Sequence, residues 1–437
     1  MKKINHIQHA QWFRDSSPYI NAHQGKTFVL HLPGKAIEHE NFRNIIKDIL
    51  LLHSLGIKLI LVHGAAIQID RALEQANIQN HQQGHIRITS IEVLGIAESV
   101  MGRIRFEIEA ALSRGVVNAP AGIKDVFVCS GNFLKAKPIG ILDGIDFLHT
   151  GHIRKVNTEA IQQQLDARAI VLISPLGFSP SGEVFNINSA EVATEVASAF
   201  PADKLVFFCK EHGIQDPKGQ LINELQLDDI LDSQIEDHGP LSFARQACIK
   251  NVDRCHLIGY GEDGALLEEL FTRDGSGTQV TRNSYEQIRK AEATDVGGII
   301  ELIRPLEDEG ILKRRPRELI EAEIERFFVI SRDGMIVSCA ALYPMGQDGE
   351  LACLATHPDY RNGNRAERLL NAINAEAESL AYNKLIVLTT QSAHWFTERG
   401  FEEVSISTLL ESQQFLYNFQ RNSKLFTRVV KKSAQKE

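Results

Sequence analysis

The first two-thirds of the chain alternate short apolar runs rich in β-branched residues with stretches of helical periodicity. Between the runs lie patterns such as residues 42–55, in which apolar residues recur at helical spacing. Strands that are apolar along their whole length and separated by helices favour a mostly parallel sheet with helices on both faces. We therefore predict an α/β fold here, with strands at residues 28–32, 58–63, 125–129, 169–174, 204–209 and 255–259.

This alternation of strands and helices ends near residue 280. The stretch 272–283 (TRDGSGTQVTRN) is rich in glycine, threonine and charge, which is typical of the end of a domain. We therefore predict a first domain over residues 1–280 and a second over 284–437, a division that a chain of 437 residues makes reasonable. The second domain is predicted to be α+β, with helices at 286–304, 365–381 and 393–399, strands at 327–331, 335–343, 350–356 and 384–390, and a hairpin turn at 332–334.

Composition excludes several classes of function. The net charge of -9 argues against a nucleic-acid-binding surface, although the basic cluster Lys313–Arg317 suits a small anionic substrate. No apolar run approaches the ~20 residues that span a bilayer, and the first 20 residues do not read as a signal peptide. The six cysteines form no CxxC pair and no zinc-ligand spacing, so we expect no metal, reduced thiols and a cytoplasmic protein.

The densest chemical signal lies in residues 350–370 (ELACLATHPDYRNGNRAERLL). An apolar strand there leads through a short loop into a helix. A loop that opens a helix presents free backbone N–H groups and the positive end of the helix dipole, which suits a pyrophosphate. Gly363 and Ala366 would let phosphates approach the backbone closely. An ordinary strand-to-helix turn is the alternative reading.

This stretch resembles the GNAT acetyltransferase family, whose acetyl-CoA loop follows the pattern (Q/R)xxGx(G/A). One position departs from the pattern, because Asn364 stands where the family has glycine. A second motif, residues 394–401 (HWFTERGF), resembles the short aromatic helix that closes the family's domain, with Gly400 ending it. The resemblance implies acetyl-CoA as a co-substrate, with no permanently bound cofactor, and a donor site formed by Leu354, Thr356, Arg361, Asn362, Gly363, Asn364, Arg365 and Ala366.

Almost the whole chain resembles the bacterial N-acetylglutamate synthases. The segments that carry the resemblance are FRDSSPYI, EDGALLEELFTRDGSGTQV, ILKRRPRELIE, GELACLATHPDYR and RNSKLF. The resemblance implies transfer of acetyl from acetyl-CoA to the α-amino group of L-glutamate, in the first step of arginine biosynthesis. Because guanidinium groups bind carboxylates in a bidentate manner, Arg315, Arg317 and Arg421 become candidate clamps for glutamate, with Cys353 as a further substrate contact. A solvated basic patch is the alternative for Arg421.

The same resemblance suggests how the reaction would proceed. The ammonium group of glutamate must lose a proton before it can attack, and Glu350 is placed like the family's proposed base. The backbone N–H of Leu354 would stabilise the oxyanion, and Thr389 is a weakly supported candidate for the general acid. An exposed residue at a strand end is the alternative for Glu350.

The first domain resembles the amino-acid kinases, and among them N-acetylglutamate kinase. Such kinases carry a Lys-x-Gly-Gly after the first strand and a glycine run after the second. Here the first site reads His31-Leu32-Pro33-Gly34 and the second His63-Gly64-Ala65-Ala66, so phosphoryl transfer looks lost. Lys35 could be a displaced lysine, but it lies beyond the loop.

What persists in this domain resembles the arginine-binding signature of the arginine-sensitive kinases and synthases. It consists of Lys210, His256, Glu269, Gly275 and Gly277. The resemblance implies that Glu269 pairs with the guanidinium of arginine and that Lys210 binds its carboxylate. A helix C-cap is the alternative for Gly275.

Residues 8–22 carry Trp12, Phe13 and Tyr19 among polar residues. In arginine-sensitive relatives such a leading helix joins dimers into a hexameric ring, which makes a homo-oligomer the expectation. A simple docked helix is the alternative. For the whole chain, the competing functions are a phosphotransferase like N-acetylglutamate kinase and a non-catalytic arginine sensor.

Overall fold

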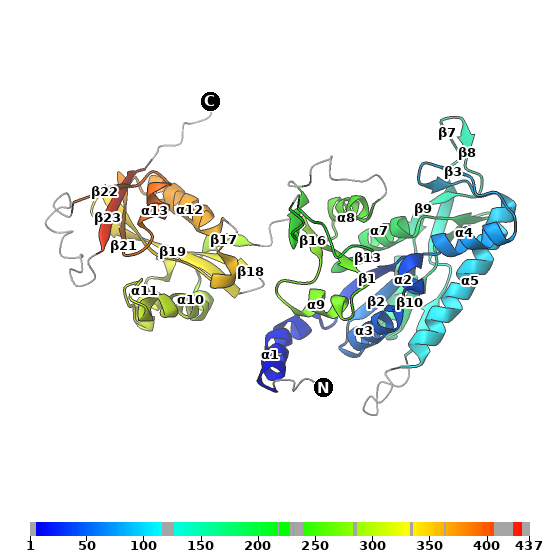
Figure 1. Cartoon of the computed structure of the whole chain (residues 1–437), viewed down its shortest axis with the longest axis horizontal. Coiled ribbons are helices and arrows are strands. Elements are labelled where there is room, and N and C mark those ends of the chain that lie inside the picture. Colours follow the sequence, from blue (N-terminus) through cyan, green and yellow to red (C-terminus); the bar gives the residue numbers. More distant parts are fainter. Residues whose placement is uncertain are drawn as a thin grey trace. The chain divides into compact units, whose positions relative to one another are not determined.

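The computed structural model of the chain describes residues 6–115, 126–200, 202–216, 218–227, 230, 239–282, 286–332, 335–361, 364–405 and 423–430. The chain divides into two compact units, Met1–Asn283 and Ser284–Glu437, each with its own sheet (Figure 1). The expected turn at 332–334 lies largely outside the described residues, as does the first residue of the strand expected at 125–129.

The first unit is built on an eight-stranded sheet with the order β14-β16-β15-β13-β1-β2-β10-β5. Six of its strands run parallel to one another: β1 (Thr27–Leu32), β2 (Lys58–His63), β5 (Val128–Ser130), β10 (Ile170–Ile173), β13 (Lys204–Cys209) and β15 (Arg254–Gly259). The other two are β14 (Glu224–Gln226) and β16 (Thr278–Thr281). The central strands are buried along their whole length, as expected of a sheet covered on both faces.

Helices cover both faces of this sheet, so the predicted α/β fold class is confirmed. One apolar core forms beneath α3 (Phe42–Ser54), α4 (Ala66–Gln75), α5 (Ile91–Ser113) and α9 (Ala265–Phe271). A second core forms beneath α6 (Thr158–Asp166), α7 (Ser189–Ala199) and α8 (Pro240–Ile249). The helices α1 (His6–His23) and α2 (Gly34–Glu38) precede and follow β1.

Smaller strands extend this unit beside α4 and α7 (Figure 1). A second sheet has the order β12-β11-β6-β9, and two short hairpins accompany it. These strands are β3 (Gln82–Gln83), β4 (Ile86–Arg87), β6 (Leu134–Pro138), β7 (Ile141–Leu142), β8 (Ile145–Asp146), β9 (Gly151–Val156), β11 (Leu176–Phe178) and β12 (Val184–Asn186).

The second unit is a seven-stranded sheet with the order β17-β18-β19-β20-β21-β23-β22. All neighbours are antiparallel except β20 and β21, which run parallel. The strands are β17 (Gln287–Lys290), β18 (Phe327–Arg332), β19 (Met335–Met345), β20 (Asp348–Thr356), β21 (Lys384–Thr389), β22 (Glu402–Val404) and β23 (Lys424–Val429). The helices are α10 (Val296–Asp308), α11 (Arg317–Ala322), α12 (Arg365–Ser379) and α13 (Ala393–Thr397), with 3-10 turns at Ala293–Asp295, Ile324–Arg326 and Pro358–Tyr360.

The prediction of a helix over residues 286–304 is wrong for its first residues. Residues Gln287–Lys290 form β17, which pairs antiparallel with β18 and packs Ile288 against the core. The helix starts later because Glu292 and Asp295 form a reciprocal capping box, a strong helix-start signal that the periodicity obscured.

The stretch 272–283, read from the sequence as the end of the first domain, also contains a strand that was not predicted. Its residues Thr278–Thr281 form β16, a strand of the first sheet that pairs antiparallel with β15. The chain therefore adds one more strand before it leaves the first unit.

Among the described residues, no helix combines the length and apolar character that crossing a bilayer requires. The same part of the chain contains no group of three or more side chains suited to holding a metal ion.

Candidate functional site

In the second unit, β20 leaves its parallel neighbour halfway along its length. Its pairing with β21 stops at Leu351, although β21 continues to Thr389. Cys353 has a φ of 52°, and neither Cys353 nor Leu354 has a partner in the register of β20 with β19 or β21. A non-glycine residue with positive φ in a strand marks a bend of the kind made by a bulge. The two strands therefore diverge after Leu351, which makes the backbone N–H of Leu354 a candidate donor to a ligand.

Glu350 lies on β20 just before this divergence. It stands opposite Tyr343 on β19 and Ile386 on β21, and its side chain is half-buried. Burial raises the pKa of the Glu350 carboxyl, while the charges of Arg315 and Lys313 act in the opposite direction. A carboxylate with a raised pKa holds a proton more readily, which suits a general base.

Arg315 is the cation beside Glu350. Its guanidinium lies 5.2 Å from the ring centre of Tyr343, and the guanidinium of Arg326 lies at the same distance. Arg317 points elsewhere: it is exposed, and its Nε donates to Glu321 Oε1 at 2.6 Å. The structure thus brings Arg315, but not Arg317, to the predicted acceptor site.

Cys353 is buried at the bend of β20. Burial, as the largest cause, raises the pKa of its thiol to about 11. The sulfur therefore stays protonated at neutral pH, which agrees with a role as a substrate contact and not as a nucleophile.

The predicted donor loop connects β20 to α12. Asn362 and Gly363 lie outside the described residues. Asn364 has φ 57° and ψ 13° and precedes the first residue of α12. This is the left-handed conformation that glycine favours and that asparagine tolerates better than most residues. The departure from the family pattern is therefore compatible with the glycine-like backbone.

Two arginines of this loop and helix are held by one acidic residue. Glu286, which is 6% exposed, accepts a hydrogen bond from Arg365 Nε at 2.6 Å and another from Arg368 at 2.7 Å. Arg365 also donates to the carbonyl of Tyr360 at 2.8 Å. Arg361 is exposed and Ala366 is half-buried. Arg365 therefore fixes the first turn of α12, a positioning role that sequence reasoning missed.

The two predicted hydroxyl residues have partners within the protein. Thr389 is buried at the end of β21, and its Oγ1 accepts a hydrogen bond from the backbone N–H of Ser392 at 3.0 Å. Thr356, at the end of β20, shares a hydrogen bond with Ser338 at 2.8 Å between hydroxyls. Arg421, the third predicted clamp, lies outside the described residues.

In the first unit, the predicted arginine-binding residues centre on a buried polar chain. Lys204 Nζ lies 3.2 Å from His256 Nε2, and His256 Nδ1 lies 2.6 Å from Glu269 Oε1. Burial and the charge of Lys204 lower the pKa of His256 to about 4. A neutral imidazole that accepts from Lys204 and donates to Glu269 satisfies all three groups. Sequence reasoning missed Lys204, whose only signal was a lysine at the start of an apolar strand.

The two predicted glycines wrap around Glu269. Its Oε2 accepts from the backbone N–H groups of Ser276 and Gly277, each at 2.9 Å. Gly275 has φ 66°, and a Cβ there would lie 2.4 Å from Glu269 Oε2. Lys210 lies just beyond β13 and is exposed. The structure thus joins His256, Glu269, Gly275 and Gly277, and within the described part of the chain no hydrogen bond or ion pair links them to Lys210.

Neutral imidazoles lie at both kinase-like loops: His31 stands where the kinases carry the lysine, and His63 precedes the second loop, while Pro33, Ala65 and Ala66 interrupt the glycine runs. His31 is buried, its Nε2 lies 3.0 Å from Ser189 Oγ, and burial lowers its pKa to about 3. His63 contacts Ser174 in the same manner at 2.8 Å, and burial lowers its pKa to about 4. A Cβ on Gly64 would lie 3.0 Å from the backbone N of Gly34, so the two loops are already in close contact.

Comparisons with known proteins agree with both units. Residues 26–259 match the amino acid kinase family, and residues 323–403 match the acetyltransferase (GNAT) domain. The amino-acid acetyltransferase of Azotobacter vinelandii is 48% identical over 430 residues, covering 97% of this chain and 99% of that protein. That of Serratia proteamaculans is 48% identical over 427 residues, covering 95% of this chain and 97% of that protein.

Solved structures agree as well. The N-acetylglutamate synthase from Neisseria gonorrhoeae is 36% identical and covers 97% of this chain and 99% of its own. Its complex with coenzyme A and L-arginine aligns with a TM-score of 0.86, and its complex with coenzyme A and N-acetyl-glutamate aligns with 0.61.

Fold and site together define an acetyltransferase in which a GNAT domain follows a domain of the amino-acid kinase fold. The high sequence identity to curated relatives over nearly the whole length identifies one family within this class. This chain belongs to the amino-acid acetyltransferases.

Proposed function

We propose that this chain transfers the acetyl group of acetyl-CoA to the α-amino group of L-glutamate, and that L-arginine binds its first unit and regulates the reaction. The observation that carries the proposal is the divergence of β20 from β21 after Leu351, one residue beyond Glu350, whose carboxyl is influenced by the charge of Arg315. The Neisseria gonorrhoeae relative, which was solved with coenzyme A, L-arginine and N-acetyl-glutamate, supports the choice of ligands.

In the proposed reaction, Glu350 takes a proton from the ammonium group of glutamate. The free amine attacks the thioester carbonyl, and the backbone N–H of Leu354 stabilises the oxyanion that forms. The C–S bond then breaks and the thiolate of CoA leaves with the electron pair, while the attacking nitrogen loses its second proton, which protonates the thiolate. Because a thiol has a pKa near ~8.5, the thiolate leaves readily, and the hydroxyl of Thr389 is at most an assisting proton donor.

The proposed acceptor site suits a dicarboxylic amino acid. Arg315 provides a half-buried cation close to Glu350, so one carboxylate of glutamate can pair with it. Arg317 and Arg421 remain candidates for the second carboxylate, and Cys353 for an apolar contact. Arg317 would have to leave Glu321 to take part.

Binding of acetyl-CoA is assigned to the loop before α12. The residues are Thr356, Arg361, Asn362, Gly363, Asn364, Arg365 and Ala366, together with Leu354. Asn364 has a left-handed backbone, and α12 begins at the next residue. The free backbone N–H groups at such a helix start can bind the pyrophosphate. Arg365 is assigned a supporting role, since Glu286 and the Tyr360 carbonyl already hold its guanidinium.

The arginine effector is assigned to the loop around Glu269. The carboxylate of Glu269, the imidazole of His256 and the backbone near Gly275 and Gly277 form the proposed guanidinium side, with Lys210 as the proposed partner of the carboxylate. Lys204 keeps His256 in the tautomer that donates to Glu269.

A kinase-like phosphotransferase is a weaker second candidate. Phosphoryl transfer needs positive charge at the phosphate, and His31 and His63 are neutral at physiological pH. We therefore propose that the first unit is catalytically dead. A non-catalytic arginine sensor is also weaker, because Asn364, its best support, adopts the glycine-like conformation.

We further propose a cytoplasmic homo-oligomer, with a hexamer as the assembly to test. On α1, the side chains of Trp12 and Phe13 are 52% and 61% exposed. Exposed aromatic residues on a leading helix suit contact with another subunit.

A thiol-release assay tests the main proposal. The full chain is incubated with acetyl-CoA and each amino acid in turn, with and without L-arginine. We expect thiol release to be fastest with L-glutamate, and we expect its rate to change when L-arginine is added. Formation of ADP from ATP with N-acetylglutamate would instead support the kinase, and no release with any amino acid would support the sensor.

A further inference from the structure

The proposed reaction gives no role to Tyr343, a residue of β19 in the second unit. Tyr343 pairs with Glu350 across the two antiparallel strands, and residues directly opposite each other in such a pair have their side chains on the same face of the sheet. Its ring packs against the apolar core beneath α10 and α11, where the ring centre of Phe327 lies 6.4 Å away. Tyr343 therefore lies on the face of the sheet that carries the proposed base.

The hydroxyl of Tyr343 is a buried donor. Its oxygen is buried and has no hydrogen-bond partner among the described residues. Burial raises the pKa of this hydroxyl well above its ordinary value, so the group keeps its proton at physiological pH. The charge of Arg315 acts on the pKa in the opposite direction, but a guanidinium can only donate, so the proton of Tyr343 stays available. A buried donor without an acceptor is unfavourable, and a ligand that supplies the acceptor would remove this cost.

Two guanidinium groups lie against the ring of Tyr343. Those of Arg315 and Arg326 are each 5.2 Å from the ring centre, which is within cation–π distance. Arg326 donates to Glu323 at 2.8 Å, whereas Arg315 forms no ion pair within the described parts of the chain. An unpaired guanidinium thus lies next to an unused hydroxyl proton. This pair of donors fits the two oxygens of one carboxylate.

We infer that Tyr343 is a specificity-determining residue, whose hydroxyl donates a hydrogen bond to the carboxylate of glutamate that pairs with Arg315. The inference rests on the proposed transfer of acetyl to glutamate and adds a residue that recognises this acceptor. A site built to form a hydrogen bond with a substrate group rejects analogues that lack the group, because its own polar atoms are then left unpaired. Tyr343 therefore selects acceptors that carry a carboxylate at this position.

The variant Tyr343→Phe tests the inference, because it removes the hydroxyl and keeps the ring between the same neighbours. Thiol release is measured with glutamate and acetyl-CoA each varied in turn. We expect the KM for glutamate to rise roughly tenfold or more, since a hydrogen bond to a charged group is lost, and the KM for acetyl-CoA to stay the same. Tyr382→Phe is the matched control, because Tyr382 packs against the other core, beneath α12. Thermal melts check that both variants fold.

Two analogues of glutamate show which carboxylate the hydroxyl contacts. L-Norvaline lacks the side-chain carboxylate, and 4-aminobutyrate lacks the α-carboxylate. We expect Tyr343→Phe to lower kcat/KM for glutamate and for one analogue by a similar factor, and to leave the other analogue unaffected. The unaffected analogue is the one that lacks the contacted group. An analogue that turns over too slowly is measured as a competitive inhibitor against glutamate.

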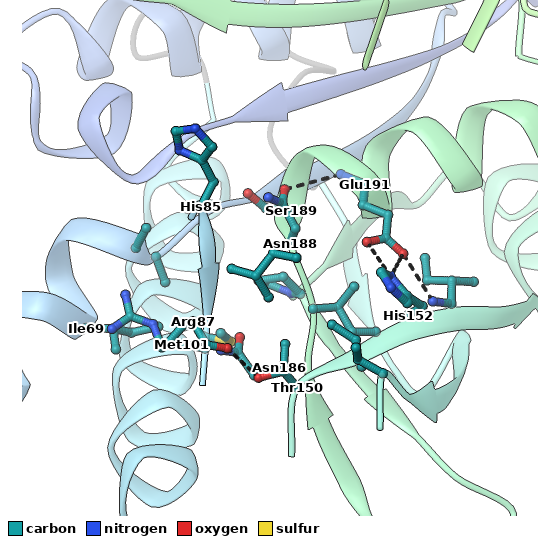
Figure 2. A pocket seen from close by; sticks show the side chains of 18 of the residues that line it. Ile69, His85, Arg87, Met101, Thr150, His152, Asn186, Asn188, Ser189 and Glu191 are labelled. Carbon is teal, nitrogen blue, oxygen red and sulfur yellow. Dashed lines mark hydrogen bonds and ion pairs between the residues drawn. The ribbon is translucent and has the colours of Figure 1, made fainter. Parts of the chain in front are cut away.

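Kinetics are preferred to direct binding because the first unit has a cavity of its own, of about 850 Å³, in whose wall Glu191 pairs with His152 at 3.0 Å (Figure 2). A small acid bound there would add to a binding isotherm of the full chain. An unchanged KM for glutamate in Tyr343→Phe, or an equal loss with all three acceptors, would overturn the inference and leave the proposed function standing. A wild-type chain that releases no thiol with glutamate would refute the proposed function itself.

Discussion

At the scale of single residues, buried histidines are held neutral. Burial lowers the pKa of His31 to about 3, and of His63 and His256 to about 4. Each imidazole has a hydrogen-bond partner that suits its neutral form. In the unfolded chain these residues would titrate near ~6.5. Between the two values the unfolded state binds more protons, so folding stability falls as the pH drops from about 6.5 toward about 4.

The variant His31→Gln should reduce this dependence, because glutamine can still reach Ser189 but does not titrate. We expect its melting temperature to fall less steeply than that of the wild type between pH 6.5 and 4.5. Thermal melts across this range measure the difference. His394, whose side chain is 92% exposed, supplies the control variant His394→Gln, which should follow the wild type. Parallel curves for all three proteins would contradict the assignment.

Glu350 is the residue on which the proposed chemistry depends most. Its pKa is raised, so its base form is lost as the pH falls through that value, and the activity should fall with it. Glu350→Gln cannot accept a proton at neutral pH. We expect turnover at pH 7 to drop by roughly tenfold or more and to recover in part at higher pH, where free amine is available. An unchanged pH–rate profile in the variant would point to another base.

At the scale of elements, strands were predicted best. The bounds of β2 and β13 agree with expectation, because each is an unbroken apolar run. Strand β17 was missed because its four residues directly precede a helix and fit the helical spacing of apolar residues. Strand β16 was missed because its polar residues pair at the sheet's flank. Short and flanking strands depend on partners far along the chain, which periodicity does not reveal.

The start of α12 offers a prediction at this scale. Asn364 is left-handed, a conformation that is strained by roughly 1–2 kcal/mol for ordinary residues. Asn364→Val should therefore disturb the donor loop and raise the KM for acetyl-CoA more than that for glutamate. Asn364→Gly should be tolerated, since glycine adopts this backbone freely. Steady-state kinetics with each substrate varied in turn would separate the two. Equal KM values for both variants would show that the loop does not depend on this backbone.

At the scale of the whole first unit, one buried chain of contacts links sites far apart in sequence. His23, in α1, contacts the carbonyl of Leu270 at 2.8 Å. The preceding residue, Glu269, contacts His256, which in turn contacts Lys204. A ligand that engages Glu269 would therefore act on α9, on the central sheet and on the end of α1 at once.

Glu269→Ala tests the proposed effector site. Removal of a charge-assisted pair of about 1.5–3 kcal/mol should weaken L-arginine binding roughly tenfold or more by calorimetry. Thiol release without arginine should barely change. Glu268→Ala is the matched control, since Glu268 is the exposed neighbour on the same helix. A thermal melt checks that the variant folds.

Thermodynamic linkage between arginine binding and glutamate binding provides a stricter test. If arginine weakens glutamate binding by some factor, glutamate must weaken arginine binding by the same factor. Equal arginine binding by Glu269→Ala and the wild type would refute the proposed effector site. It would not affect the assignment of the second unit as an acetyltransferase.

The class of both domains and the candidate residues near the donor loop could be predicted from the sequence, because local periodicity and short motifs encode them. Which side chains contact one another could be seen only in the folded chain. Arg315 lies over the ring of Tyr343, the residue opposite Glu350, while Arg317 forms a hydrogen bond with Glu321. Lys204 joins His256 across neighbouring parallel strands, a contact between residues 52 positions apart. The physical reason is that pairing between distant segments fixes side-chain direction and burial, and these in turn set the charge of each group.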